Sequence, residues 1–316
     1  MMDWTDRHCR MFHRQFSRRT LMYTEMVTSA ALVRGGAHHL LEHSEAEHPV
    51  ALQLGGSDPG ELAQAARMGA EAGYDEINLN CGCPSDRVQS GSFGAVLMER
   101  PDLVAEACAA MAAAQPREVT VKCRIGVDDQ EPEEVLPRFL SAVRDAGVRR
   151  VIIHARKAWL QGLSPRENRD IPPLDYDLVH RMKAAFPDLH VSINGGIMSL
   201  AEARSHLSAG LDGVMVGRAA YHDPAVILCE ADQLIWEDTD LSVTAEAAVC
   251  AMEPYVRAHL AAGGRLHQVT RHMLGAFAGR PGARAWRRHL SEAATDPAAD
   301  WHVVAAALEH VTRQAA

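Results

Sequence analysis

The chain has 316 residues, which is enough for one large α/β domain followed by a smaller one, and its composition is that of an ordinary soluble protein. Its formal net charge of −9 argues against indiscriminate binding to nucleic acid. Seven cysteines without a CxxC pair indicate a reducing, cytoplasmic environment without a metal centre, and neither a membrane span nor a signal peptide is recognisable.

The chain opens on a helical pattern that continues to about Phe16, and Asp3 or Thr5 can cap it. Seven short apolar or β-branched runs then predict strands over 21–26, 50–54, 76–80, 119–124, 151–154, 190–193 and 213–216. Alanine-rich segments between them predict helices over 59–73, 101–114, 133–147, 176–186 and 200–210. This alternation predicts parallel βαβ units, in either an open doubly wound sheet or a closed (β/α)₈ barrel.

Two observations favour the barrel. No Gly-x-Gly-x-x-Gly turn follows a strand, so the dinucleotide fingerprint of the open fold is missing. Polar residues also recur at the carboxyl ends of the strands, which meet on one face of a barrel: Glu25, Gln53, Asn80, Lys122, Arg124, His154, Asn194 and Arg218. We therefore predict an α/β (β/α)₈ TIM barrel. Only seven strands are recognisable, and because the first element is a helix we expect the eighth to precede Met1.

Beyond about Pro224 the strand signal ends, and helical spacing predicts helices over 245–260, 268–277, 283–291 and 300–312. We expect a catalytic barrel over 1–230 and a small helical domain over 231–316. Between Glu253 and Glu292 there are seven arginines and no acidic residue. This local positive charge indicates a surface that faces a polyanion, although a solvated basic helix face is the simpler alternative.

The turn after the third predicted strand concentrates reactive side chains. It contains Asn80, Cys81, Gly82, Cys83 and Pro84. The glycine allows close approach of backbone to a ligand and the proline fixes the turn, so the thiol of Cys83 is expected to be held in one place. The alternative is that Cys83 is a small buried apolar residue, as most free cysteines are.

Taken together, motifs spread along almost the whole chain resemble those of the tRNA-dihydrouridine synthases. They are Met1-Met2-Asp3-Trp4, Gln53-Leu54-Gly55-Gly56, Asn78-Leu79-Asn80 with Gly82-Cys83-Pro84-Ser85, Lys122-Cys123-Arg124, His154-Ala155-Arg156, Asn194-Gly195-Gly196 and Gly217-Arg218. The segments Gly162-Leu163-Ser164-Pro165-Arg166-Glu167-Asn168-Arg169 and Trp286-Arg287-Arg288 are most similar to the A subfamily.

The resemblance implies an FMN-containing barrel that reduces uridines 20 and 20a in the D-loop of tRNA to dihydrouridine, with NADPH as the reductant. The implied FMN-binding residues are Met1, Met2, Gln53, Lys122, His154, Asn194, Gly195, Gly196, Gly217 and Arg218. Gln53 would bond the isoalloxazine edge, and Lys122 would place positive charge near the ring. The glycines and Arg218 would hold the phosphate. A turn-making glycine, an ion-paired lysine and a structural histidine are the ordinary alternatives.

Reduction of the uracil double bond requires a hydride at C6 and a proton at C5. An ordinary cysteine thiol, with a pKa of about 8.5, is mostly protonated at neutral pH, so Cys83 suits the role of general acid.

For tRNA, the resemblance implies Asn80, Arg169, Arg287 and Arg288, and we add Arg87, Arg271 and Arg284 on position and charge alone. Trp286 could stack on a base, but at helical spacing it is more often a core residue.

Other expectations follow from the same reading. We expect a monomer, and we expect poor FMN retention or stability for a chain that begins at Met1, since a barrel lacking its first strand exposes unpaired edges. Two alternative functions are an FMN barrel that acts on a small pyrimidine or enone and a catalytically impaired tRNA-binding protein.

Overall fold

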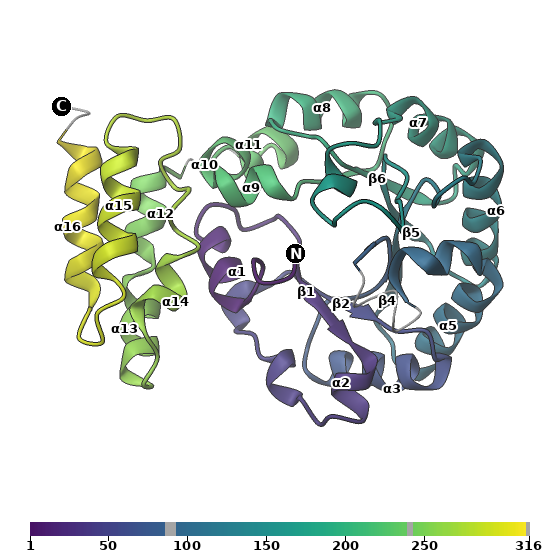
Figure 1. Ribbon diagram of the computed structural model, residues 1–316, viewed down its shortest axis with the longest axis horizontal. Coiled ribbons are helices and arrows are strands. Elements are labelled where there is room, and N and C mark those ends of the chain that lie inside the picture. The colour runs from purple at the N-terminus through teal and green to yellow at the C-terminus, as the bar shows by residue number, and fades with distance from the viewer. Residues whose placement is uncertain (86–92, 239–242, 314–316) are drawn as a thin grey trace.

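The computed structural model describes residues 1–85, 93–238 and 243–313. Seven parallel strands pair in sequence order into one curled sheet, with helices on its outer side (Figure 1). The strands are β1 (Met22–Thr28), β2 (Val50–Gly55), β3 (Glu76–Cys81), β4 (Glu118–Arg124), β5 (Arg150–His154), β6 (His190–Asn194) and β7 (Gly213–Met215). Every predicted strand is present, and the predicted barrel-type α/β fold is confirmed.

The helices between the strands also match the predicted segments to within a few residues. They are α3 (Pro59–Glu71), α5 (Pro101–Ala114), α6 (Pro132–Asp145), α7 (Tyr176–Ala185) and α8 (Leu200–Ser208). Three of them begin at a proline, whose fixed φ suits the first helical position and whose missing N–H is not needed there. Short elements that the sequence pattern did not predict are α2 (Ser29–Val33), η1 (His38–Leu41), η2 (Glu45–Glu47), η3 (Gly94–Glu99), η4 (Glu167–Arg169), α9 (Arg218–His222), α10 (Pro224–Leu228) and α11 (Ala231–Trp236).

The two faces of the sheet differ in chemistry. On β3, Ile77, Leu79 and Cys81 are fully buried in the apolar layer between the sheet and the helices. The alternate residues Asn78 and Asn80 bond to side chains of neighbouring strands on the inner face. The inside of this barrel is therefore polar, which places hydrogen-bonding groups below the strand ends.

The first helix, α1 (Arg7–Arg14), begins at a residue other than the expected ones. Asp6 is its N-cap, and its carboxylate accepts hydrogen bonds from the backbone N–H groups of His8 and Cys9. The prediction of Asp3 or Thr5 as the cap was wrong, because the preceding residues form a separate turn: the amides of Trp4 and Thr5 both bond to Met1 O. The same turn gives Asp3 a positive φ of 62°.

The C-terminal part is helical, with α12 (Ala245–Ala251), α13 (Glu253–Ala261), α14 (Leu266–Thr270), α15 (Ala283–Ala293) and α16 (Trp301–Thr312) (Figure 1). The single helix predicted over 245–260 is interrupted at Met252, because Pro254 starts a new helix. The helix predicted over 268–277 is also shorter, since regular helix ends at Thr270.

A second apolar core joins these helices to the barrel. Trp286 is fully buried in it, and its indole N–H donates to Met273 O at 3.1 Å, while Phe12 of α1 packs in the same cluster. Trp286 is therefore a core residue and does not present its ring for base stacking.

Among the described residues, no helix is long and apolar enough to cross a membrane.

Candidate active site at the strand ends

The turn after β3 holds Cys83 through side chains on two strands. Asn80 Oδ1 accepts hydrogen bonds from the backbone N–H groups of Gly82 and Cys83, both at 3.0 Å, and Arg124 Nε donates to Gly82 O at 3.1 Å. Cys83 is partly exposed, and its thiol lies 3.6 Å from Ser85 Oγ. Cys81 is fully buried, and burial holds its pKa well above the ordinary value. Of the two neighbouring thiols, Cys83 is therefore the accessible one.

Arg124 connects this turn to the loop after β5. It is 4% exposed, and its Nη1 donates to Lys157 O at 3.1 Å and to Asn168 O at 2.8 Å. Asn168 is fully buried, and its side chain bonds both the N–H and the C=O of Trp159. Sequence reasoning placed Arg124 among the strand-end polar residues but did not see that it holds two loops together.

Lys122 and His154 lie beside Arg124 on the inside of the sheet. The strand register pairs Asn80 with Lys122, and Arg124 with His154. Burial, followed by the charge of Arg124, lowers the pKa of Lys122 to about 8. Burial, together with the charges of Arg124 and Lys122, holds the pKa of His154 well below its ordinary value, so its imidazole is neutral at pH 7. Its Nδ1 is buried and has no hydrogen-bond partner in the described part of the chain.

The turn after β6 leaves little room for side chains. Gly195 and Gly196 have φ values of 109° and 73°, a region that favours glycine. A Cβ on Gly196 would lie 2.5 Å from a methyl group of Leu174. Tyr176 Oη donates to Gly195 O at 2.6 Å, and Asn194 Nδ2 donates to Met215 O at 2.8 Å. The backbone of this turn is therefore held in one conformation, and the two glycines have no side chains that would cover it.

The remaining residues implied for the cofactor, Arg218, Met1 and Met2, differ in their exposure and contacts. Arg218 is partly exposed and pairs with Asp170 at 2.7 Å. Met1 Sδ lies 3.7 Å from the position of a Cβ on Gly217, which places the first residue at the end of β7. Met2 is 51% exposed.

Gln53 is buried, and both polar atoms of its side chain bond asparagines of β3. Glu25, which the sequence placed at a strand end but not in the site, has a buried Oε1 without a partner among the described residues.

The arginines expected to bind tRNA fall into different environments. Arg284, Arg287 and Arg288 are exposed on α15 and form no ion pair within the described residues. Arg271 donates to Asp6 Oδ2 at 2.6 Å and to Asp3 O, so part of its charge is engaged within the chain. Arg169 is partly buried near Arg218, and its Nε is buried without a partner in the described structure. Arg87 lies outside the described residues.

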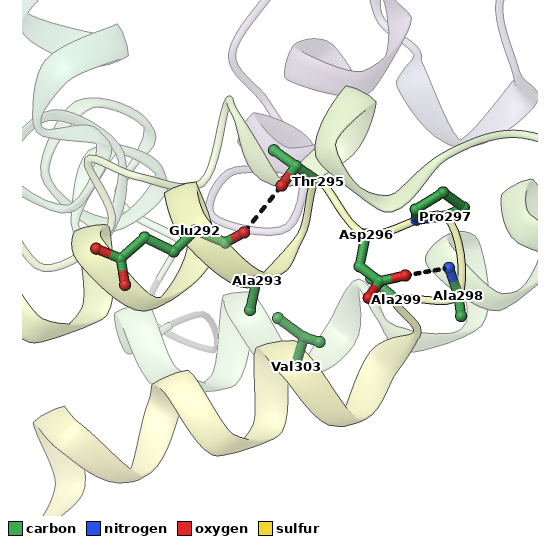
Figure 2. A pocket seen from close by; sticks show the side chains of 8 residues that line it. All are labelled: Glu292, Ala293, Thr295, Asp296, Pro297, Ala298, Ala299 and Val303. Atoms are coloured by element: carbon green, nitrogen blue, oxygen red, sulfur yellow. Dashed lines mark hydrogen bonds between the residues drawn. The ribbon is translucent and has the colours of Figure 1, made fainter.

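A surface hollow of about 540 Å³ lies far from these strand ends, between α15 and α16 (Figure 2). It is lined by Glu292, Ala293, Thr295, Asp296, Pro297, Ala298, Ala299 and Val303. Its two acidic side chains, Glu292 and Asp296, would repel a phosphate, and the described residues that line it include no cation. The strand ends, with their cations, thiol and fixed glycine turn, remain the candidate site.

A parallel barrel with such groups at the carboxyl ends of its strands has the architecture of a barrel enzyme. In agreement, morphinone reductase has a similar fold, with a TM-score of 0.50 at 15% sequence identity over 71% of this chain and 80% of that chain. The family model described as dihydrouridine synthase matches residues 1–315. The chain belongs to the dihydrouridine synthase family.

Relatives named tRNA-dihydrouridine(20/20a) synthase are similar over nearly their whole length. The Shewanella oneidensis protein is 55% identical over 98% of this chain and 92% of its own length. The Vibrio cholerae protein is 53% identical over 99% and 95%, and the Escherichia coli K12 protein is 55% identical over 98% and 90%.

Proposed function

We propose that this protein is a flavin-dependent oxidoreductase that reduces uridines 20 and 20a of tRNA to 5,6-dihydrouridine, with FMN at the strand ends and NADPH as the reductant. Membership of the dihydrouridine synthase family and the names of its close relatives support the reaction. The observation that carries the proposal is the accessible thiol of Cys83, which stands on a turn fixed by Asn80 and Arg124.

The described residues fit a flavin at this place. The unpartnered Nδ1 of His154 and the amino group of Lys122 offer polar contacts to a heteroaromatic ring. Gln53 would meet the ring edge from β2, where its side chain already bonds Asn78 and Asn80. Asn194, Gly195, Gly196, Gly217 and Arg218 would hold the phosphate, and Met1 and Met2 would cover one side. Arg218 would then share its charge between the phosphate and Asp170.

The chemistry divides between the cofactor and the chain. When bound, the flavin supplies the hydride that C6 of the uracil needs. Cys83 Sγ donates the proton to C5, and the resulting thiolate is stabilised by Lys122 and Arg124, whose charges both interact with this thiol. Ser85 Oγ, at 3.6 Å, is placed to relay a proton back to Cys83.

The substrate base must leave a folded RNA, so binding has to come largely from backbone phosphates. We assign this role to residues 231–316 and in particular to Arg284, Arg287 and Arg288, which are exposed and uncompensated in the described structure. Arg169 and Asn80 lie closer to the site and would meet the extracted nucleotide. We further propose that the protein acts as a monomer in the cytoplasm.

Anaerobic stopped-flow absorbance tests this proposal. The flavin is reduced with NADPH and then mixed with unmodified tRNA, with the same tRNA already carrying dihydrouridine, or with free uridine. We expect rapid reoxidation by unmodified tRNA alone. Equal reoxidation by free uridine would instead identify a small-molecule reductase, and tRNA binding without any reoxidation would identify an RNA-binding protein.

A further inference from the structure

A row of buried polar side chains runs along β3 on the inner face of the sheet, below the candidate site, and includes one residue each from β2 and β4. Asn80 Nδ2 donates to Gln53 Oε1 at 2.7 Å, and Gln53 Nε2 donates to Asn78 Oδ1 at 2.9 Å. Asn78 Nδ2 donates to Thr120 Oγ1 at 2.7 Å, and Thr120 Oγ1 donates to Glu76 Oε1 at 2.6 Å. All five residues are at most 8% exposed, so water does not compete for these bonds.

Every hydrogen bond in this row points the same way, toward Glu76. An ionised carboxylate only accepts, so Thr120 must donate to it and is left to accept from Asn78. An amide has its oxygen and its nitrogen on opposite sides, so the orientation of Asn78 determines that of Gln53, and Gln53 determines that of Asn80. One carboxylate therefore fixes the direction of three amides.

At the other end, this direction determines what the Cys83 turn meets. With its nitrogen committed to Gln53, Asn80 presents its oxygen to the N–H groups of Gly82 and Cys83. In the reverse orientation the Asn80 amino group would face two N–H donors, and both hydrogen bonds would be lost. The turn that carries the thiol therefore depends on the orientation of a row that ends at Glu76, at the other end of the same strand, β3.

We propose that Glu76 is a positioning residue of the active site, which fixes the Cys83 turn through the row Thr120, Asn78, Gln53 and Asn80. The role of Cys83 as the proton donor rests on the proposed function. The effect of Glu76 on the geometry of the turn is independent of that function.

The surroundings of Glu76 support its role as the fixed end. Tyr23 Oη also donates to Oε1 at 2.6 Å, and Arg150 Nη1 lies 3.7 Å from Oε2. Burial raises the pKa of Glu76, and the hydroxyl groups of Thr120 and Tyr23 and the charge of Arg150 counteract this shift. Glu118 pairs with the same arginine at 3.2 Å but forms no bond with the row in the described structure, which makes it a matched control.

The substitution Glu76→Gln tests the direction of the row. A glutamine can turn its oxygen to Arg150 and its amino group to Thr120, which allows the whole row to reverse. The double change Glu76→Gln with Asn78→Asp keeps the charge but moves the acceptor-only group to position 78, where it accepts from Gln53 and restores the original direction. If Glu76→Gln acted only by disturbing the packing of the fold, the second substitution, Asn78→Asp, would not restore the parent behaviour.

The primary measurement is the rate at which iodoacetamide alkylates Cys83, resolved by peptide mass spectrometry, with the exposed Cys250 as internal standard. We expect Glu76→Gln to alkylate at least about threefold faster at Cys83, because the released turn opens more often. The double variant and Glu118→Gln should react at the parent rate. A Glu76→Gln rate within twofold of the parent or slower, or a double variant as fast as Glu76→Gln, would overturn the proposal.

A second pair of variants keeps the test informative if Glu76→Gln does not fold. Thr120→Ser retains the hydroxyl of the row and Thr120→Val removes it at similar volume, so only the valine variant should expose Cys83; equal rates in the two would refute the row.

Single-turnover reduction of tRNA should fall on the order of tenfold in the variants with an open turn, with tRNA affinity unchanged. If the parent fails to reduce tRNA, the proposed function fails, while the alkylation rates still test Glu76.

Discussion

Replacement of Cys83 by alanine separates proton donation from every other property of the site. Among the described residues near Cys83, the alcohol of Ser85 and the guanidinium of Arg124 are weaker acids than a thiol, whereas Lys122, whose pKa burial lowers to about 8, has comparable acidity. Since Lys122 is assigned to the flavin, the loss of Cys83 should lie within the range of about 10² to 10⁴ that a general acid contributes. Flavin content and the rate of reduction by NADPH should stay at the parent values, because the thiol is not needed for either.

The assay is single-turnover oxidation of the reduced enzyme by unmodified tRNA, with Cys81→Ala as the matched control. Cys81 lies two residues away but is fully buried on the outer side of the sheet, beside Cys108 and Cys123. Its truncation should cost about 1 kcal/mol of stability through lost packing and leave the rate unchanged. The reasoning fails if Cys83→Ala retains more than a tenth of the parent rate, or if Cys81→Ala is equally slow.

Three further changes have clear expectations. Replacing Arg287 and Arg288 together with alanine should weaken tRNA binding and reduce the slope of log Kd against log salt by about 1 to 2, and an unchanged slope would place the RNA elsewhere. Burial, with a smaller effect of a neighbouring histidine, lowers the pKa of His13 to about 4, so the folded protein keeps it neutral while the unfolded chain takes up a proton below about pH 6.5. Stability should therefore be complete above pH 6.5 and fall by up to about 3 kcal/mol toward pH 4, and Tm measured against pH should show a smaller drop in His13→Asn. Gly196→Ala should lose about 1 to 3 kcal/mol in urea unfolding, because it combines a positive φ with a clash, and Gly210→Ala, which has a positive φ but open space, should lose less.

The strands and helices of the barrel were predictable because each depends on a local pattern. Short apolar or β-branched runs predicted all seven strands to within two residues. The errors occurred where a single residue overrides the pattern. Pro254 divides an otherwise continuous apolar stripe into α12 and α13, and Asp6 caps α1 because Arg271 and His272, more than 260 residues away, hold its other oxygen.

The candidate site was predictable to the extent that strand ends share one edge of a sheet. That rule brought Asn80, Lys122 and His154 together, and the register confirms that they lie on neighbouring strands. It could not reveal what Arg124 and Glu76 do. Their partners are fixed by the curvature of the sheet and by the path of the loops, so the pairing of Arg124 with Asn168 or of Glu76 with Thr120 leaves no spacing signal in the sequence.

The burial of Trp286 also determines where the arginines of α15 point. Consecutive residues of an α-helix are rotated by about 100° around its axis, so the contact of this indole with Met273 holds Arg284, Arg287 and Arg288 on the opposite, outward side. Inserting one residue after Trp286 would turn the two following arginines by a quarter of a circle without changing the net charge. The helix with this insertion would keep the same arginines but would no longer present them on the same side.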